Sequence, residues 1–265
     1  MTRDGGRVRA NETGRTVTSR VLSILEAFET HGPSLSLSQL AELTGLPVST
    51  AHRLLGELHA WGALARDEQG RYQVGLRLWE LSQSAGRRLR DTARPYLQDL
   101  FSLTQETSHI AIREGNEALY VDRVYSSKRV PRASRIGGRL PLHATAVGKV
   151  LLAHEEPWFR EAYLQGDLEA RTRRTHIDPA ALADELGQIA EQGYAVTLEE
   201  ARAGACSIAV PVAGRSAQVE AAVGLVLLST QRKTLTRHLP VLRGVASRIE
   251  AAIARYPSGY LRQRG

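Results

Sequence analysis

A short segment between residues 38 and 60 constrains the fold of this chain more than any other feature. Ser38 can cap a first helix, which Gly45 ends with a tight turn. The inward residues of that helix are Leu40, Ala41 and Leu43. Pro47 suits the first turn of a second helix. Apolar residues recur there at steps of three and four, as Ala51, Leu54, Leu55 and Leu58. Two short helices joined in this way are typical of a helix-turn-helix.

The residues on either side complete a winged helix. An earlier helix is predicted by one apolar face, formed by Val17, Val21, Ile24, Leu25 and Phe28. It stops at the breaker His31-Gly32-Pro33. After Gly62 the apolar period changes toward two, which predicts short strands over residues 63–67 and 70–74. The turn between them, residues 67–70, makes this hairpin the wing.

The outward side of the second helix is polar and cationic. At 100° per residue, Ser49 and Arg53 lie opposite the buried face. A recognition helix presents such residues to base edges in the major groove, where arginine can pair with guanine. We expect DNA contacts from Ser38, Ser49, Thr50, His52, Arg53, Arg66, Arg71 and Tyr72. The open alternatives are a merely solvated helix face and a winged helix that contacts only protein.

The rest of the chain predicts a second domain of the α+β class, an antiparallel sheet with helices around it. Strands are expected over residues 109–113, 118–124, 194–197, 207–212 and 219–228, and helices over 144–153, 158–164, 179–191 and 235–255. Pro95 is expected to restart a helix. The predicted domains are a flexible arm (1–15), the winged helix-turn-helix (16–77), a linker helix (78–91), the sheet domain (92–258) and a tail (259–265).

Composition bounds the class of protein. The formal net charge of +7 suits phosphate contact, although an arginine-rich solvated surface explains it equally well. A single cysteine excludes an internal disulfide framework. The N-terminal residues lack the apolar core of a secretory signal, and we find no apolar run long enough to span a bilayer. We therefore expect a soluble, cytoplasmic protein without membrane contact.

Several stretches resemble the IclR (isocitrate lyase regulator) family. RVLSILEAF, LSLSQLAELTGLPVSTAHRLLGEL and RDEQGRYQVG are similar to its DNA-binding domain. RLPLHATAVGKVLLA, EQGYAVTLEEARAGACSIAVPV and AAVGLVL resemble its effector-binding domain. The resemblance implies a winged helix, a helical linker and a GAF/PAS-like sensor domain. It also implies a homodimer or homotetramer on a pseudo-palindromic DNA operator, controlled by an organic or aromatic acid. Both repressors and activators occur in the family, and we expect a repressor of a nearby catabolic operon.

The resemblance also implies the positions that bind the effector. In this sequence they are Leu140, Ala146, Val147, Thr197, Ser207, Gly224 and Val226. Some relatives have an acidic residue, a cysteine and two serines at the last four of these positions. The pocket is therefore expected to be less polar here and to suit an aromatic ligand better than a two-carbon acid. A second departure is Val48, where relatives commonly have a basic residue.

Three nearby arginines are a further possibility for the effector. Arg129, Arg132 and Arg135 could neutralise its carboxylate, although a solvated segment is the more ordinary interpretation.

An enzymatic function is not favoured by the sequence. AVGKV lacks the first glycine and the metal-binding hydroxyl of a phosphate-binding loop. His143 has no second histidine or carboxylate at metal-ligand spacing nearby, and Cys206 enters what reads as a buried strand. We expect no catalytic residue, no metal and no cofactor. An enzyme or ligand carrier whose winged helix does not bind DNA is the competing class.

Overall fold

The computed structural model describes residues 16–82, 87–128, 130–131, 133, 135–214 and 217–255. The chain forms two compact units, residues 1–85 and 86–265. The predicted arm (1–15) and tail (259–265) lie outside the described residues. No helix in the described part of the chain is both long and apolar enough to cross a membrane.

The first unit is a winged helix, as predicted. Its elements are α1 (Val17–His31), β1 (Ser34–Leu35), α2 (Leu37–Thr44), α3 (Val48–Trp61), β2 (Leu64–Arg66), β3 (Tyr72–Val74) and α4 (Leu76–Ser82). The three strands pair in the order β1-β3-β2. Its core is formed by apolar residues of helices α1, α2 and α3 and of the wing, including Ile24, Phe28, Leu40, Leu54, Leu55 and Leu64. Strand β1 was not predicted, because two residues are too few to show a period.

Helix α2 is capped by Ser36, so the prediction that Ser38 caps it is wrong. The Ser36 hydroxyl accepts a hydrogen bond from the backbone N–H of Gln39 (3.2 Å), and the Gln39 side chain accepts one from the Ser36 N–H (3.0 Å). This reciprocal pair is a capping box. Leu43, predicted to face inward, is 42% exposed, because the buried side of α2 is formed by Leu40, Ala41 and Thr44.

The second unit is the predicted α+β domain. Its strands are β4 (Thr107–Glu114), β5 (Glu117–Val124), β6 (Arg139–Pro141), β7 (Ala195–Leu198), β8 (Ala205–Ala213) and β9 (Val219–Leu228). They form one sheet in the order β6-β5-β4-β9-β8-β7, and every described pair is antiparallel. Its helices are α5 (Arg87–Thr104), α6 (Ala146–Ala153), α7 (Pro157–Leu164), α8 (Pro179–Gln192) and α9 (Leu239–Ile253).

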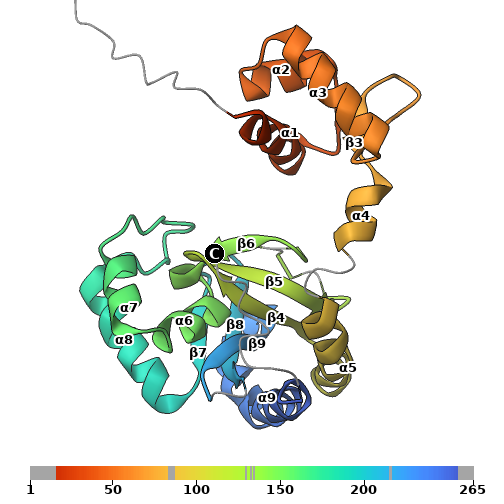
Figure 1. Ribbon diagram of the computed structural model, residues 1–265. Coiled ribbons are helices and arrows are strands. Elements are labelled where there is room, and N and C mark those ends of the chain that lie inside the picture. The colour runs from red at the N-terminus through yellow and green to blue at the C-terminus, as the bar shows by residue number, and fades with distance from the viewer. Residues whose placement is uncertain are drawn as a thin grey trace, which may run out of the picture. The chain divides into compact units, whose positions relative to one another are not determined.

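The sheet separates two helical layers (Figure 1). Helices α5 and α9 cover one face, and α6 lies on the other with α7 and α8 beyond it. Large residues such as Ile208, Val223 and Leu225 pack toward α5 and α9. Small residues such as Ala209 and Ala222 lie on the α6 side, where they let the helix approach the sheet.

Two predicted boundaries in this unit, at Pro95 and at the start of the last helix, are corrected. Helix α5 continues through Pro95, because Leu89, Ala93, Leu97 and Leu100 form one buried face across it. The predicted linker helix corresponds to the end of α4 and the start of α5, and residues 83–86 lie outside the described part of the chain. The last helix begins at Leu239, after a 3-10 segment over Ser229–His238.

We predict that Ser36→Ala lowers the free energy of unfolding by about 1 kcal/mol, because the backbone N–H of Gln39 loses the hydroxyl that accepts its hydrogen bond. Ser38→Ala is the matched control, since Ser38 is exposed inside the same helix turn. Urea unfolding of the full chain measures both. Equal losses in the two variants would contradict the assignment of the cap.

Candidate functional site

The exposed side of α3 carries the residues predicted to contact DNA. Ser49, His52 and Arg53 are exposed and Thr50 is half-buried. Arg53 donates a hydrogen bond to Glu57 one turn further along, and both side chains are more than half exposed. Such a surface pair is weak, so the guanidinium can exchange Glu57 for a base edge or a phosphate. Ser38 is exposed on α2.

Of the three DNA contacts predicted in the wing, two side chains are exposed and one is buried. Arg66 and Arg71 are exposed, but Tyr72 is 2% exposed and belongs to the core. The Arg66 guanidinium lies over the Tyr72 ring, 4.7 Å from its centroid, and donates to the Tyr72 hydroxyl. Tyr72 is therefore corrected from a DNA contact to a core residue that orients Arg66. Period-two alternation in this strand already pointed to an inward Tyr72.

A pocket in the second unit lies among the sheet, the start of α6 and the loop after β7. Its lining residues are His109, Tyr120, Arg123, Pro131, Ala133, Leu140, Thr145, Ala146, Thr197, Glu200, Ala201, Arg202, Ala205, Cys206, Ser207 and Val226. Five of the predicted effector positions are in this set: Leu140, Ala146, Thr197, Ser207 and Val226. Val147 and Gly224 are not among the lining residues: Val147 packs in the core, and Gly224 is opposite His109 on the neighbouring strand.

The pocket contains buried polar residues that sequence reasoning does not assign to it. His109 and Arg123 are directly opposite each other on β4 and β5, and their exposed fractions are only 2% and 4%. Burial, together with the charge of Arg123, lowers the pKa of His109 to about 3, so the imidazole is neutral at pH 7. The guanidinium of Arg123 lies 5.2 Å from the ring centroid of Tyr125. Neither His109 nor Arg123 is among the predicted effector positions, which suggested a pocket less polar than in relatives.

Arg123 reaches the pocket through an irregularity in β5. Ile110 pairs with Asp122 and Ala111 pairs with Tyr120, so Val121 has no counterpart on β4. Such a bulge reverses the alternation of side chains along the strand. Tyr120 and Arg123 consequently line the same pocket, although strict alternation places them on opposite faces. The periodicity of the sequence does not identify this bulge.

Two hydroxyls and a short loop form the other side of the pocket. Thr197 Oγ1 and Ser207 Oγ are 2.5 Å apart across β7 and β8. The loop between these strands begins at Glu199, whose φ of 61° is unusual for a residue other than glycine. The Glu199 carboxylate accepts a hydrogen bond from the Gly204 N–H (2.8 Å) and so fixes the loop that carries Glu200 to Arg202.

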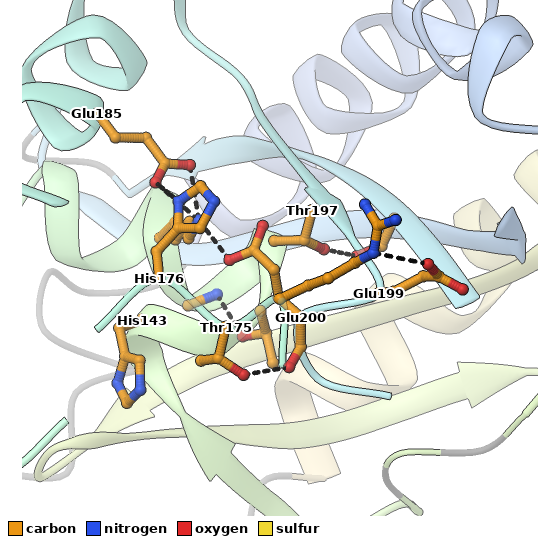
Figure 2. Close-up of polar contacts among 12 residues, drawn as sticks. His143, Thr175, His176, Glu185, Thr197, Glu199 and Glu200 are labelled. Carbon is orange, nitrogen blue, oxygen red and sulfur yellow. Dashed lines mark hydrogen bonds and ion pairs between the residues drawn. The ribbon is translucent and has the colours of Figure 1, made fainter. Parts of the chain in front are cut away.

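Glu200 joins the pocket to a charge network around the buried Lys149 (Figure 2). Lys149 is fully buried on α6, and its Nζ is 2.7 Å from Glu200 Oε2 and 2.6 Å from Glu185 Oε1. His176 Nδ1 lies 2.8 Å from Glu185 Oε2. His176, Glu185 and Glu200 are close enough to share a cation, and the Lys149 ammonium already binds both carboxylates. Lys149 is therefore a structural residue.

The residues considered for catalysis have structural contacts. Gly148 allows close packing, because a Cβ there would lie 2.3 Å from the Leu142 carbonyl oxygen. His143 Nδ1 is 2.8 Å from the Tyr163 hydroxyl, and its Nε2 is 3.0 Å from the Glu169 carbonyl oxygen. Burial raises the pKa of the Cys206 thiol to about 11, which disfavours the nucleophilic thiolate.

Fold and sites together define a DNA-binding regulator with a separate ligand-binding domain. Residues 17–68 match the IclR helix-turn-helix domain, and residues 83–251 match the bacterial transcriptional regulator IclR C-terminal domain. The chain therefore belongs to the IclR family of transcriptional regulators.

Individual relatives cover most of the chain. The HTH-type transcriptional regulator XynR of Escherichia coli K12 is 36% identical over 80% of this chain and 86% of its own length. The HTH-type transcriptional repressor AllR of the same strain is 33% identical over 81% of this chain and 80% of its own length. A crystal structure of an IclR homolog from Microbacterium hydrocarbonoxydans, complexed with 4-hydroxybenzoate, is 32% identical with a TM-score of 0.85. The match covers 91% of this chain and 100% of the homolog's chain.

We predict that Lys149→Met lowers the free energy of unfolding by about 3–5 kcal/mol at pH 7, because two carboxylates lose their buried counter-charge. Urea unfolding measures the loss. The matched control is Arg248→Met, which breaks the exposed pair of Arg248 with Asp99 (2.9 Å) and should cost less than about 1 kcal/mol.

The loss should shrink as the pH falls. Burial raises the pKa of Glu200 even with Lys149 beside it, so protonation of this carboxyl favours the folded state. Without Lys149 the pKa of Glu200 rises further, so the variant regains stability as the pH falls through that raised pKa toward the ordinary pKa of a glutamate. A loss that does not change with pH would contradict this account of the network.

Proposed function

We propose that the protein is a cytoplasmic, non-enzymatic repressor of a nearby catabolic operon, controlled by an aromatic acid that binds the pocket of the second unit. The observation that carries the choice of ligand is the buried Arg123 in a pocket otherwise lined in part by Tyr120, Leu140 and Val226. A guanidinium binds a carboxylate through two parallel hydrogen bonds, and apolar walls suit an aromatic ring. The 4-hydroxybenzoate complex of a relative supports the same ligand class.

The DNA contact is assigned to α3 and the wing. Ser49, Thr50, His52 and Arg53 would enter the major groove, while Arg66 and Arg71 would contact the backbone beside it. Ser38 would add a phosphate contact from α2. A homodimer or homotetramer can present two such helices about 34 Å apart, which matches a pseudo-palindromic operator. The repressor AllR among the relatives supports repression as the sign of control.

Neighbouring residues on β5 offer a route from the ligand to the DNA-binding unit. Arg123 lines the pocket, while Asp122 is fully buried and bound by Arg94 of α5 at 2.7 Å. The Arg123 backbone N–H also donates to the Asp122 carboxylate (2.8 Å). In the sequence, α5 directly follows the residues that join the two units. A ligand that shifts Arg123 would thus change the packing of α5, and effector affinity would differ between DNA-bound and free protein.

We predict that Arg53→Ala raises the Kd for duplex DNA from the region upstream of the protein's own gene by about 5- to 150-fold, as expected for one base or phosphate contact worth 1–3 kcal/mol. Fluorescence anisotropy at two salt concentrations measures the Kd and its salt slope. Arg248→Ala in the second unit removes the same charge and serves as control. Wild-type affinity in Arg53→Ala would overturn the role of α3 in DNA binding.

A further inference from the structure

His109 is a polar residue of the pocket with one ring nitrogen that lacks a hydrogen-bond partner among the described residues. Its Nδ1 is buried and has no hydrogen-bond partner among the described residues. Buried polar atoms in native proteins are nearly always bonded, and an exception that lines a cavity points to a ligand atom. Because the imidazole is neutral, Nδ1 can donate one hydrogen bond to a ligand oxygen when Nε2 carries the lone pair.

Gly224 explains how the imidazole fits. Gly224 is directly opposite His109 on the neighbouring strand β9. A Cβ at position 224 would lie 3.0 Å from His109 Nε2 and 2.9 Å from the Ile208 carbonyl oxygen. The glycine does not line the pocket, so its contribution passes through the position of the His109 ring.

The partner of His109 across the ladder is a cation. His109 and Arg123 form one cross-strand pair and both line the pocket, so one ligand group can contact both. A neutral imidazole beside a guanidinium gives this subsite a net positive charge. A carboxylate fits this subsite best, because its two oxygens can accept hydrogen bonds from two guanidinium N–H groups and from one imidazole N–H.

The hydroxyl pair of Thr197 and Ser207 lies on β7 and β8, at the opposite edge of the sheet from β5. Strand β8 is two strands from β4 and three from β5, or roughly 10–14 Å at the usual spacing between strands. A ligand acid held at β4 and β5 therefore leaves its other end near the hydroxyls. Val226 lines the pocket between these positions, so an aromatic ring with a polar group at each end fits the arrangement.

We propose that His109 and Arg123 form the acid-binding subsite of the pocket, with Gly224 as a positioning residue for the His109 imidazole, and that the hydroxyl end of the effector is directed toward Thr197 and Ser207. The proposal rests on the proposed function, since it assigns an orientation to the aromatic acid.

Calorimetry on the full chain tests the acid subsite with 4-hydroxybenzoate and its uncharged amide, 4-hydroxybenzamide. The wild type should prefer the acid by about 10- to 100-fold, the value of charge-assisted hydrogen bonds. Arg123→Gln should bring that ratio close to one, and His109→Phe should lower acid affinity about 10-fold with little effect on the amide. Thermal unfolding and DNA binding establish that each variant is folded.

A double-mutant cycle tests the positioning role of Gly224. Gly224→Ala should weaken acid binding about 10-fold in the wild type and less than about 2-fold in a His109→Ala background. Gly187→Ala on α8, where a Cβ meets nothing within 4 Å, is the matched control. The cycle also distinguishes the contact of the new Cβ with His109 from its contact with the Ile208 carbonyl oxygen, because the second contact remains in the His109→Ala background.

The outcomes distinguish the two proposals. If the wild type binds 4-hydroxybenzoate and all variants keep its preference for the acid, the subsite is wrong and the proposed ligand class stands. If Gly224→Ala costs the same in both backgrounds, its positioning role is wrong. If the wild type binds neither compound, the aromatic-acid effector is wrong and the subsite falls with it.

Discussion

The bulge at Val121 is the constraint on which the arrangement of the second unit depends. It reverses the alternation of β5, so that Tyr120 and Arg123 both line the pocket while Asp122 faces the opposite layer. A regular strand would bury Arg123 against the apolar residues of α5 and α9, where the charge would be costly. One extra residue therefore places a cation in the pocket and a carboxylate against α5.

Sequence reasoning succeeded where the determining contacts are local. The winged helix follows from apolar steps of three and four, from Gly45 and from the short hairpin, all within about 60 residues. The strands β8 and β9 were likewise predicted from alternation and composition. Ser36 was missed as the cap of α2 because Ser36 and Ser38 are equally good capping residues, and only Gln39 three residues after Ser36 distinguishes them.

The pocket could be predicted only in part. Thr197, Ser207 and Val226 share one row of the sheet through pairs that span β7, β8 and β9, and the family resemblance supplied them. The placement of His109 and Arg123 side by side in the pocket depends on the pairing of β4 with β5 and on the bulge, and local periodicity shows neither. Gly224 is predicted to contact the ligand, yet a Cβ there would lie 3.0 Å from His109 Nε2, and we propose that the glycine acts through this ring. Long-range register is therefore the information that the sequence alone did not provide.

The central claim is that effector and DNA are coupled through β5 and α5, and the affinity of 4-hydroxybenzoate for free and DNA-saturated protein tests it directly. The account predicts affinities that differ by about 5- to 150-fold in the wild type. Arg94→Gln should make the two affinities equal without weakening ligand binding to the free protein. Arg248→Gln should leave the difference between them unchanged. Equal affinities in the wild type would contradict the claim, because a ligand with no preference between two states shifts neither.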